Sequence, residues 1–163
     1  SDQALVGPGM MLTVGGQDMH LLDGAGGRLR VQGDTVLLPH PVERARTQLQ
    51  AWLKEQARAE LARASDYYAD KLGKRYTRLT LRDTRSRWGS CSSAGALMYS
   101  WRLILAPRFV MEYVAAHEVA HLAEMNHSPA FWNVVQSIYG PHAEARAWLR
   151  RDGPKLHRYR FEA

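Results

Sequence analysis

His117-Glu118-Val119-Ala120-His121 lies near the end of a segment, residues 108–123, whose apolar residues recur with helical spacing. Residues four apart share a helix face, so His117 and His121 can present two imidazole nitrogens to one metal ion. Glu118 lies about 100° further round the helix and can reach a water molecule on that ion. The segment therefore predicts a zinc site with two ligands and a general base. The expected helix is apolar nearly all round, as buried helices are, through Val110, Val114, Met111, Ala115, Val119 and Leu122.

A third ligand is required, because a catalytic zinc ion has three protein ligands and one open position. His127 follows His121 by six residues, and a continuous helix would carry it about 9 Å along the axis, so the chain must turn back. Asn126 can adopt the left-handed conformation that ends a helix, and Ser128-Pro129 begins the next one. We therefore expect His127 to complete a site for one Zn²⁺ per chain. Glu144, on the last expected helix, is the alternative third ligand.

The rest of the sequence predicts a single α+β domain over residues 1–163, with an antiparallel or mixed sheet packed against helices. Short apolar runs separated by glycine-rich pairs are typical of β-hairpin turns. A long pattern with one apolar face indicates a packing helix. The expected units are a β-meander over residues 5–38, a helix over 41–72, strands over 76–83 and 96–105, a catalytic core over 75–151 and a basic tail over 152–163.

The charge is strongly positive: 22 Lys and Arg against 16 Asp and Glu give +6, with a pI of about 9.8. Much of this excess lies near the C-terminus, and beyond Gly153-Pro154 we expect an extended chain. Such a tail predicts weak, sequence-independent and salt-dependent nucleic-acid binding, while a solvated tail docked on the protein's own acidic residues is the alternative. The candidate contacts are Arg150, Arg151, Lys155 and Arg158.

The single cysteine, Cys91, excludes a disulfide framework and a cysteine-rich zinc finger. No stretch approaches the ~18 uninterrupted apolar residues of a membrane span. The start, Ser1-Asp2-Gln3, lacks the basic and apolar regions of a signal peptide. We therefore expect a cytoplasmic protein with no membrane contact.

Four segments together resemble the YgjP-like metallopeptidase family, and the resemblance is close over residues 75–150. It implies a compact zincin-type catalytic domain with zinc on three histidines. SprT-like and WLM proteases are more distant relatives at the zinc helix, and some of them act on DNA-bound proteins. The family's assigned activities include peptidase and metal-dependent hydrolase, a nucleotide pyrophosphatase among them. The segments are Arg87-Trp88-Gly89-Ser90-Cys91-Ser92, Trp101-Arg102-Leu103-Ile104-Leu105-Ala106-Pro107, His117-Glu118-Val119-Ala120-His121-Leu122 and Asn126-His127-Ser128-Pro129-Ala130-Phe131-Trp132.

These observations favour a zinc metallopeptidase that cleaves peptide or protein substrates. Glu118 would assist attack of zinc-bound water on the peptide carbonyl and return the proton to the leaving amine. By analogy with other zincins, the strand over residues 96–105 is the candidate for pairing with the peptide. Ser100 and Arg102 on its mixed face are candidate substrate contacts, with an ion pair as the alternative for Arg102.

Two other functions remain open at this point. A metal-dependent nucleotide phosphohydrolase is disfavoured because the sequence has no glycine-rich phosphate loop and no carboxylate cluster for Mg²⁺. A DNA-associated module with a structural zinc ion is disfavoured because structural sites usually have four protein ligands, often cysteines.

Overall fold

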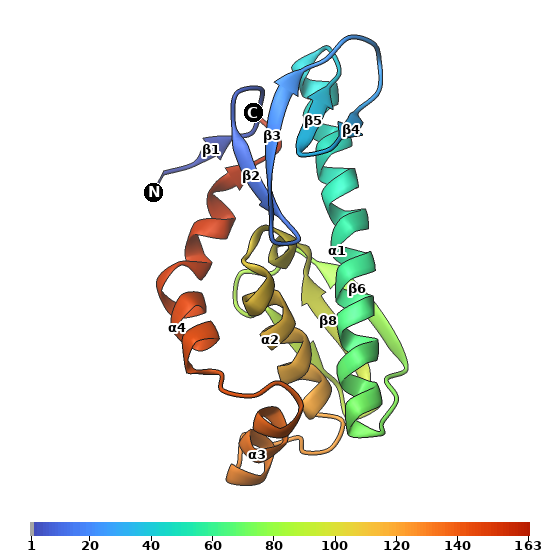
Figure 1. Ribbon diagram of the computed structural model, residues 1–163, viewed down its shortest axis with the longest axis vertical. Helices are drawn as coiled ribbons and strands as arrows, with labels where there is room; N and C mark the ends of the chain where they lie inside the picture. Colours follow the sequence, from blue (N-terminus) through green and yellow to red (C-terminus); the bar gives the residue numbers. More distant parts are fainter. Residues whose placement is uncertain (1) are drawn as a thin grey trace.

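The computed structural model describes residues 2–163, which are built along one long helix, α1 (Val42–Leu72). Figure 1 shows α1 extending along much of the longest axis of an elongated molecule. The helix ends where the sequence indicates, at Gly73, which adopts φ 71° and donates its amide to carbonyls of the last turn. Its buried side chains recur every three or four residues and face the rest of the protein: Ala45, Leu49, Leu53, Ala57, Leu61, Ala64 and Tyr68.

The first sheet covers one end of α1 and is not the expected meander. Its order is β2-β3-β5-β4, and β3 and β5 run parallel, with Leu21 opposite Val36. The chain leaves β3 and passes over residues 24–29 before β4, which leaves room for β5 to insert between β3 and β4. The strands are β2 (Met11–Val14), β3 (Gln17–Asp23), β4 (Arg30–Gln32) and β5 (Thr35–Leu38).

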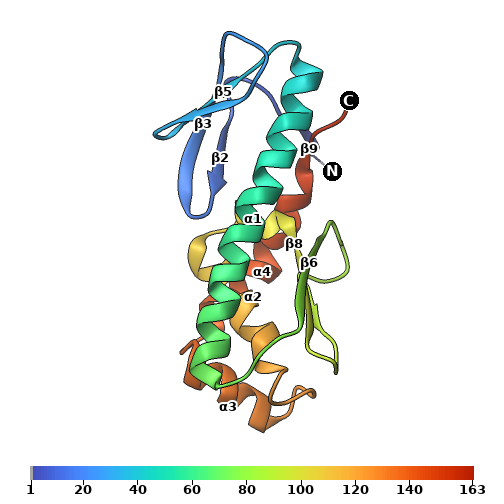
Figure 2. The same ribbon diagram turned by 90° about the vertical axis from the view of Figure 1, so that its right-hand side faces the viewer.

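A second, three-stranded sheet lies beside the other half of α1, as Figure 2 shows. Its order is β6-β8-β7, with β8 (Ala96–Ser100) parallel to β6 (Arg78–Arg82) and antiparallel to β7 (Gly89–Cys91). The strand expected over residues 96–105 is five residues shorter in the structure. It stops at Ser100, whose hydroxyl accepts a hydrogen bond from the amide of Arg102 and begins the 3₁₀-helix η1 (Trp101–Leu105).

Three further helices surround the candidate site. They are α2 (Arg108–Ala120), α3 (Pro129–Ile138) and α4 (Ala143–Arg151). Figures 1 and 2 place α2 between α1 and α4, with α3 at the end of the molecule opposite the first sheet. The result is the expected α+β arrangement of sheets packed against helices. None of the helices in residues 2–163 has the length and hydrophobicity that a membrane span requires.

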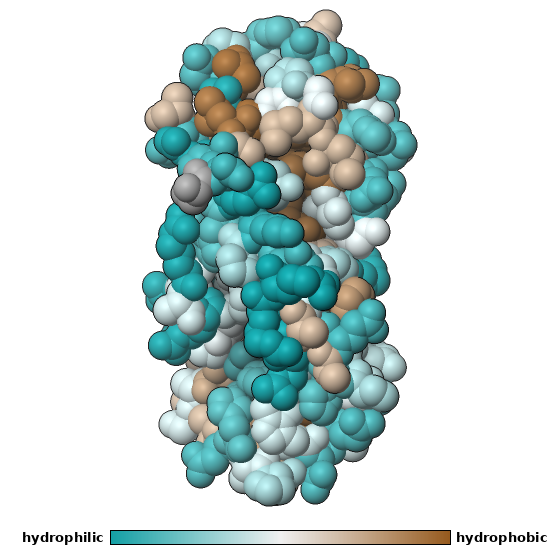
Figure 3. Space-filling view, turned by 90° about the vertical axis from the view of Figure 1, so that its left-hand side faces the viewer, coloured by the Kyte–Doolittle hydropathy of each residue, from teal (hydrophilic) through white to brown (hydrophobic). Residues whose placement is uncertain are grey.

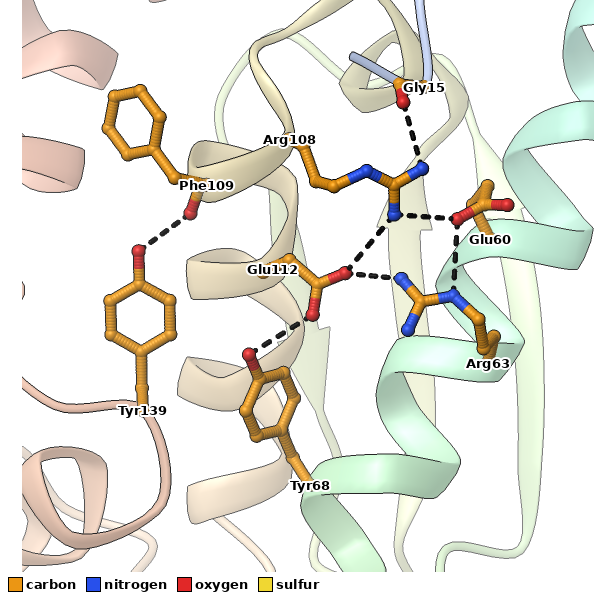
Figure 4. A network of polar contacts seen from close by, with 8 residues as sticks. All are labelled: Gly15, Glu60, Arg63, Tyr68, Arg108, Phe109, Glu112 and Tyr139. Atoms are coloured by element: carbon orange, nitrogen blue, oxygen red, sulfur yellow. Dashed lines mark hydrogen bonds and ion pairs between the residues drawn. The ribbon is translucent and has the colours of Figure 1, made fainter.

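A polar network holds α2 on α1 (Figure 4). Glu112 of α2 forms an ion pair with Arg63 and accepts a hydrogen bond of 3.1 Å from the hydroxyl of Tyr68, both on α1. Arg108, at the start of α2, donates to the carbonyl oxygen of Gly15 at 2.9 Å. These contacts connect the β2–β3 turn, α1 and α2, and so fix the helix that carries the His-Glu-x-x-His segment.

The C-terminal residues are folded, so the expectation of an extended tail is wrong. They form the 3₁₀-helix η2 (Gly153–Arg158) and the strand β9 (Tyr159–Arg160), which pairs in parallel with β1 (Ala4–Leu5). Leu156 is 5% exposed and Phe161 is 6% exposed, so both belong to the core. Burial of these apolar side chains is what holds the segment against the protein.

Candidate metal centre and active site

Three imidazoles converge at the C-terminal end of α2. His117 and His121 lie one turn apart, and His127 returns from the elbow before α3. Their ligand nitrogens all lie within 4.8 Å of one another, and Nε2 of His127 is 3.3 Å from Nε2 of His117. Two nitrogens that bind one tetrahedral zinc ion at about 2.0–2.1 Å lie about 3.3–3.4 Å apart. This pair therefore already has the spacing that a shared zinc ion requires.

A tightened turn at the end of α2 brings His127 back. The amide of Ala123 donates to the carbonyl of Ala120, one of several i→i−3 bonds that wind the chain more tightly than an α-helix. Ser128 then begins α3, its hydroxyl accepting a hydrogen bond from the third amide beyond it. Asn126 does not adopt the expected left-handed conformation: among the described residues, only glycines have a positive φ.

Hydrogen bonds at Nδ1 orient two of the imidazoles. Nδ1 of His121 lies 3.0 Å from the carbonyl oxygen of Glu124, which can only accept, so Nδ1 carries the proton and Nε2 keeps its lone pair. Nδ1 of His117 lies 3.1 Å from the hydroxyl of Tyr113, which allows the same tautomer. The ring of Phe131 stacks on His121 with 4.4 Å between centroids. Such outer contacts hold metal ligands in position.

Burial favours the neutral form of these histidines. Desolvation, reinforced by the neighbouring imidazoles, lowers the pKa of His117 to about 3. The pKa of His121 is also lowered, chiefly by burial. Neutral imidazole is the form that binds zinc, so both side chains are ready to accept a metal near neutral pH.

Glu118 is buried, 7% exposed, against the edge strand β7. A Cβ on Gly89 would lie 2.9 Å from Cγ of Glu118, so the carboxyl group occupies space that only glycine leaves open. Burial raises the pKa of Glu118 to about 8, and the positive charge of Arg87 opposes this rise. A divalent cation on the adjacent histidines would also favour the carboxylate. Glu118 is thus placed to exchange a proton beside the histidine cluster.

A cleft of about 250 Å³ adjoins His117 and Glu118. Two arginines line it, Arg87 from the loop before β7 and Arg146 from α4. Larger hollows exist elsewhere, including one between α1 and β6, but the residues that line it include none of the three histidines. The cleft is therefore the hollow that can hold a substrate next to Glu118. Its remaining lining is mostly apolar: Trp88, Gly89, Tyr113, Val114 and Leu149.

Ser100 and Arg102, which we expected to contact the substrate, do not line the cleft. Ser100 is fully buried, and Arg102 is 6% exposed. The guanidinium of Arg102 instead forms an ion pair with Asp83 at 2.7 Å and donates to the carbonyls of Leu156 and Tyr159. It therefore fastens the C-terminal segment to η1, which agrees with the ion-pair alternative. The assignment failed because the strand ends at Ser100, so Arg102 lies on η1, where the C-terminal segment covers its guanidinium.

The remaining candidates are separate from the histidine cluster. Glu144, the alternative third ligand, is not part of the group of converging ligand atoms found in residues 2–163. Burial raises the pKa of the Cys91 thiol to about 11, with a smaller contribution from Glu118, so it is a neutral thiol.

The four basic residues expected to contact nucleic acid lie on folded elements rather than on an extended tail. Arg151 and Lys155 both form ion pairs with Asp152, and Arg158 donates to the carbonyl oxygen of Asp2. Arg150 is exposed on α4. Nucleic-acid binding by these residues stays a prediction.

Three residues at the site escaped the sequence interpretation. Tyr113 precedes His117 by four residues, so helical spacing alone could have placed it beside the imidazole. Gly89 occurs in the quoted Arg87-Trp88-Gly89-Ser90 segment, but its contact is with a helix far along the chain. Arg146 was recognisable in the sequence only as a positive charge, because no sequence pattern connects it with the three histidines.

Comparisons with known proteins identify the fold and the family of the chain. A solved structure with a similar fold is the crystal structure of the metallopeptidase zymogen of Pyrococcus abyssi abylysin, with a TM-score of 0.51 and 22% sequence identity. The alignment covers 61% of this chain and 97% of that one, a likeness of fold. A search of curated proteins finds no match. The model of the YgjP-like metallopeptidase domain matches residues 27–152, well over half of the sequence, and the chain therefore belongs to the YgjP-like metallopeptidase family.

Proposed function

We propose that this protein is a zinc metallopeptidase whose ligands are His117, His121 and His127 and whose general base is Glu118. The observation that carries the proposal is the convergence of three imidazoles beside a buried carboxyl group that lines a cleft. Three protein ligands leave a position open for substrate, whereas structural zinc sites usually have four. Membership of a metallopeptidase family supports a peptide or protein substrate over a nucleotide.

In this mechanism Glu118 transfers the proton, and two neighbouring groups orient the imidazoles. A zinc ion bound here would acidify a coordinated water and polarise the substrate carbonyl. Glu118 accepts a proton from the attacking water and returns it to the leaving amine, which its elevated pKa of about 8 suits well. Tyr113 and the carbonyl of Glu124 keep the imidazoles in the ligand tautomer.

Strand β7 is the better candidate for holding the peptide, because β8 is central in its sheet. The carbonyl of Trp88 accepts from the amide of Ser100, and the amide of Ser92 donates to the carbonyl of Ala96, so both groups point toward β8. In an antiparallel pair the groups alternate, which turns the peptide groups of Gly89 and Cys91 away from β8 to the open edge. An extended substrate pairing there would lie directly beside Glu118.

The test combines metal analysis with peptide cleavage. Purified protein loaded with zinc should contain one equivalent and should cleave an unfolded protein or a quenched-fluorescence peptide library. Glu118→Gln should keep the metal and lose about 10²–10⁴-fold in rate, because glutamine matches the shape of glutamate but cannot accept the proton. Glu144→Gln is the matched control and should change neither property, since Glu144 lies outside the histidine cluster.

Loss of zinc in Glu144→Gln, or cleavage by Glu118→Gln at the wild-type rate, would contradict the assignment of ligands or base. His127→Ala should bind zinc more weakly while remaining folded, because His127 is exposed and contributes little to the core. Zinc binding to His127→Ala with wild-type affinity would remove it from the ligand set.

A further inference from the structure

The cleft beside Glu118 carries two positive charges without partners. Arg87 and Arg146 both line it and both are exposed. None of the ion pairs in residues 2–163 involves either guanidinium. Within the same part of the chain, Glu118 is the only carboxyl group in the lining of the cleft. Two free guanidinium groups facing one small cleft can receive an anion from outside.

Arg146 is held toward the site rather than left to move in solvent. Its guanidinium lies over the ring of Trp132, 4.4 Å from the centroid, and Trp132 itself stacks on His127 at 6.0 Å. A guanidinium stacked on an aromatic ring loses little further freedom when it binds a ligand.

Arg87 stands where the cleft meets a second hollow on the open face of the sheet. That hollow, about 390 Å³, is also lined by Arg78 and Arg82, and no carboxylate of the described chain lines it. Figure 3, which views the side with β1, β2 and α4, shows hydrophilic residues over much of the middle and lower surface and apolar residues mainly near the first sheet. The arginines that line the cleft and the adjoining hollow, and not the hydrophilic surface as such, favour an anionic substrate.

We propose that Arg87 and Arg146 select peptides that place a carboxylate beside the scissile bond, an inference that rests on the proposed peptidase function. The carboxylate can come from an Asp or Glu side chain or from the C-terminus of the substrate. Guanidinium groups bind carboxylates through paired, charge-assisted hydrogen bonds. The free edge of β7, at Gly89, presents N–H and C=O groups at the spacing of a β-ladder, which an extended peptide matches, so a peptide is the occupant that fits both features.

Binding without turnover tests this directly. Zinc-loaded Glu118→Gln protein is titrated with labelled pentapeptides that differ only in a central Glu or Gln, each with a free or an amidated C-terminus. The Glu peptide should bind about fivefold more tightly than the Gln peptide, a modest value because both arginines are exposed. If instead the free C-terminus gives the preference, the carboxylate recognised is the terminal one.

Substitutions separate recognition from folding. Arg146→Met should abolish the preference, and Arg146→Glu should reverse it toward a central Lys. Arg150→Met, on the same helix but outside the cleft, is the matched control and should leave the preference intact. A change in affinity that is equal for Glu, Gln and Lys peptides would show a structural effect and overturn the inference.

The remaining outcomes are also decisive. Equal binding of all peptides, or no binding, overturns the carboxylate preference, as does a single-stranded oligonucleotide that displaces the peptides through Arg87 and Arg146. Wild-type protein that cleaves peptides regardless of their charge would keep the peptidase function and remove this inference. Carboxylate-dependent binding without any cleavage by the wild type would keep the carboxylate preference and remove the peptidase function.

Discussion

Replacing Gly89 with alanine would place a carbon atom 2.9 Å from Cγ of Glu118 and 3.0 Å from the carbonyl oxygen of Met98. Carbon atoms pack at about 3.5–4.0 Å, so the first contact is too short by roughly 0.6–1.1 Å. Met98 belongs to the central strand β8 and cannot move without breaking its pairing with β7. The side chain of Glu118 must therefore shift by about an ångström.

A displacement of about 1 Å at a catalytic group can cost about 10²-fold in rate, and we expect Gly89→Ala to lose that much. Overpacking adds a stability cost of about 1–3 kcal/mol. The zinc content should not change, because the atoms nearest the added methyl group belong to Glu118 and Met98 and not to the three histidines. The assay measures initial rates at saturating peptide, zinc per chain and the thermal midpoint for each variant.

Gly7→Ala is the control, because a Cβ there meets no atom within 4 Å. A Gly89→Ala protein that retains zinc and cleaves within threefold of the wild-type rate would refute the reasoning, since Glu118 would then tolerate the displacement. A variant that loses zinc would also count against it, because the methyl group would then act on the ligands rather than on the base.

Three further changes test the framework of the site. Arg102→Met should lower the free energy of unfolding by about 3 kcal/mol in urea, because a buried guanidinium that makes four hydrogen bonds to three residues is lost; a change below 1 kcal/mol would contradict this. Tyr113→Phe should weaken zinc binding about tenfold in a chelator competition, and unchanged affinity would deny the hydroxyl a role. Burial, aided by Arg102, lowers the pKa of His157, so the unfolded chain takes up a proton below about pH 6.5 that the folded protein resists. The free energy of unfolding should therefore fall as the pH drops from 7 to 5, and His157→Phe should make that fall shallower. An unchanged dependence of the free energy of unfolding on pH would show that His157 does not contribute to it.

Local signals in the sequence predicted the elements that depend on neighbouring residues. Gly73 marks the end of α1, and Ser128-Pro129 marks the start of α3, because capping and left-handed backbone are decided within a few residues. The spacing of His117, His121 and His127 likewise predicted that their rings would meet. That the three bind zinc stays a prediction.

The errors arose where distant parts of the chain decide the outcome. Residues Trp101–Leu105 are all buried, so their apolar pattern cannot distinguish a strand from a 3₁₀-helix. Strand order within the first sheet is equally hidden, since glycine pairs permit a hairpin but do not require one. The sequence around Arg102 predicts an exposed side chain, because the C-terminal segment that buries it is more than fifty residues away in the chain.

The parallel pairing of β1 with β9 also affects the order of folding. It joins residues near opposite ends of the chain, with Ala4 beside Tyr159, and the amide of Val6 extends it to the carbonyl of Arg160. Contacts across so long a loop carry the largest closure entropy, so they form after local structure such as α1 and the β2–β3 hairpin. During synthesis β1 must therefore remain unpaired until Tyr159 and Arg160 have left the ribosome.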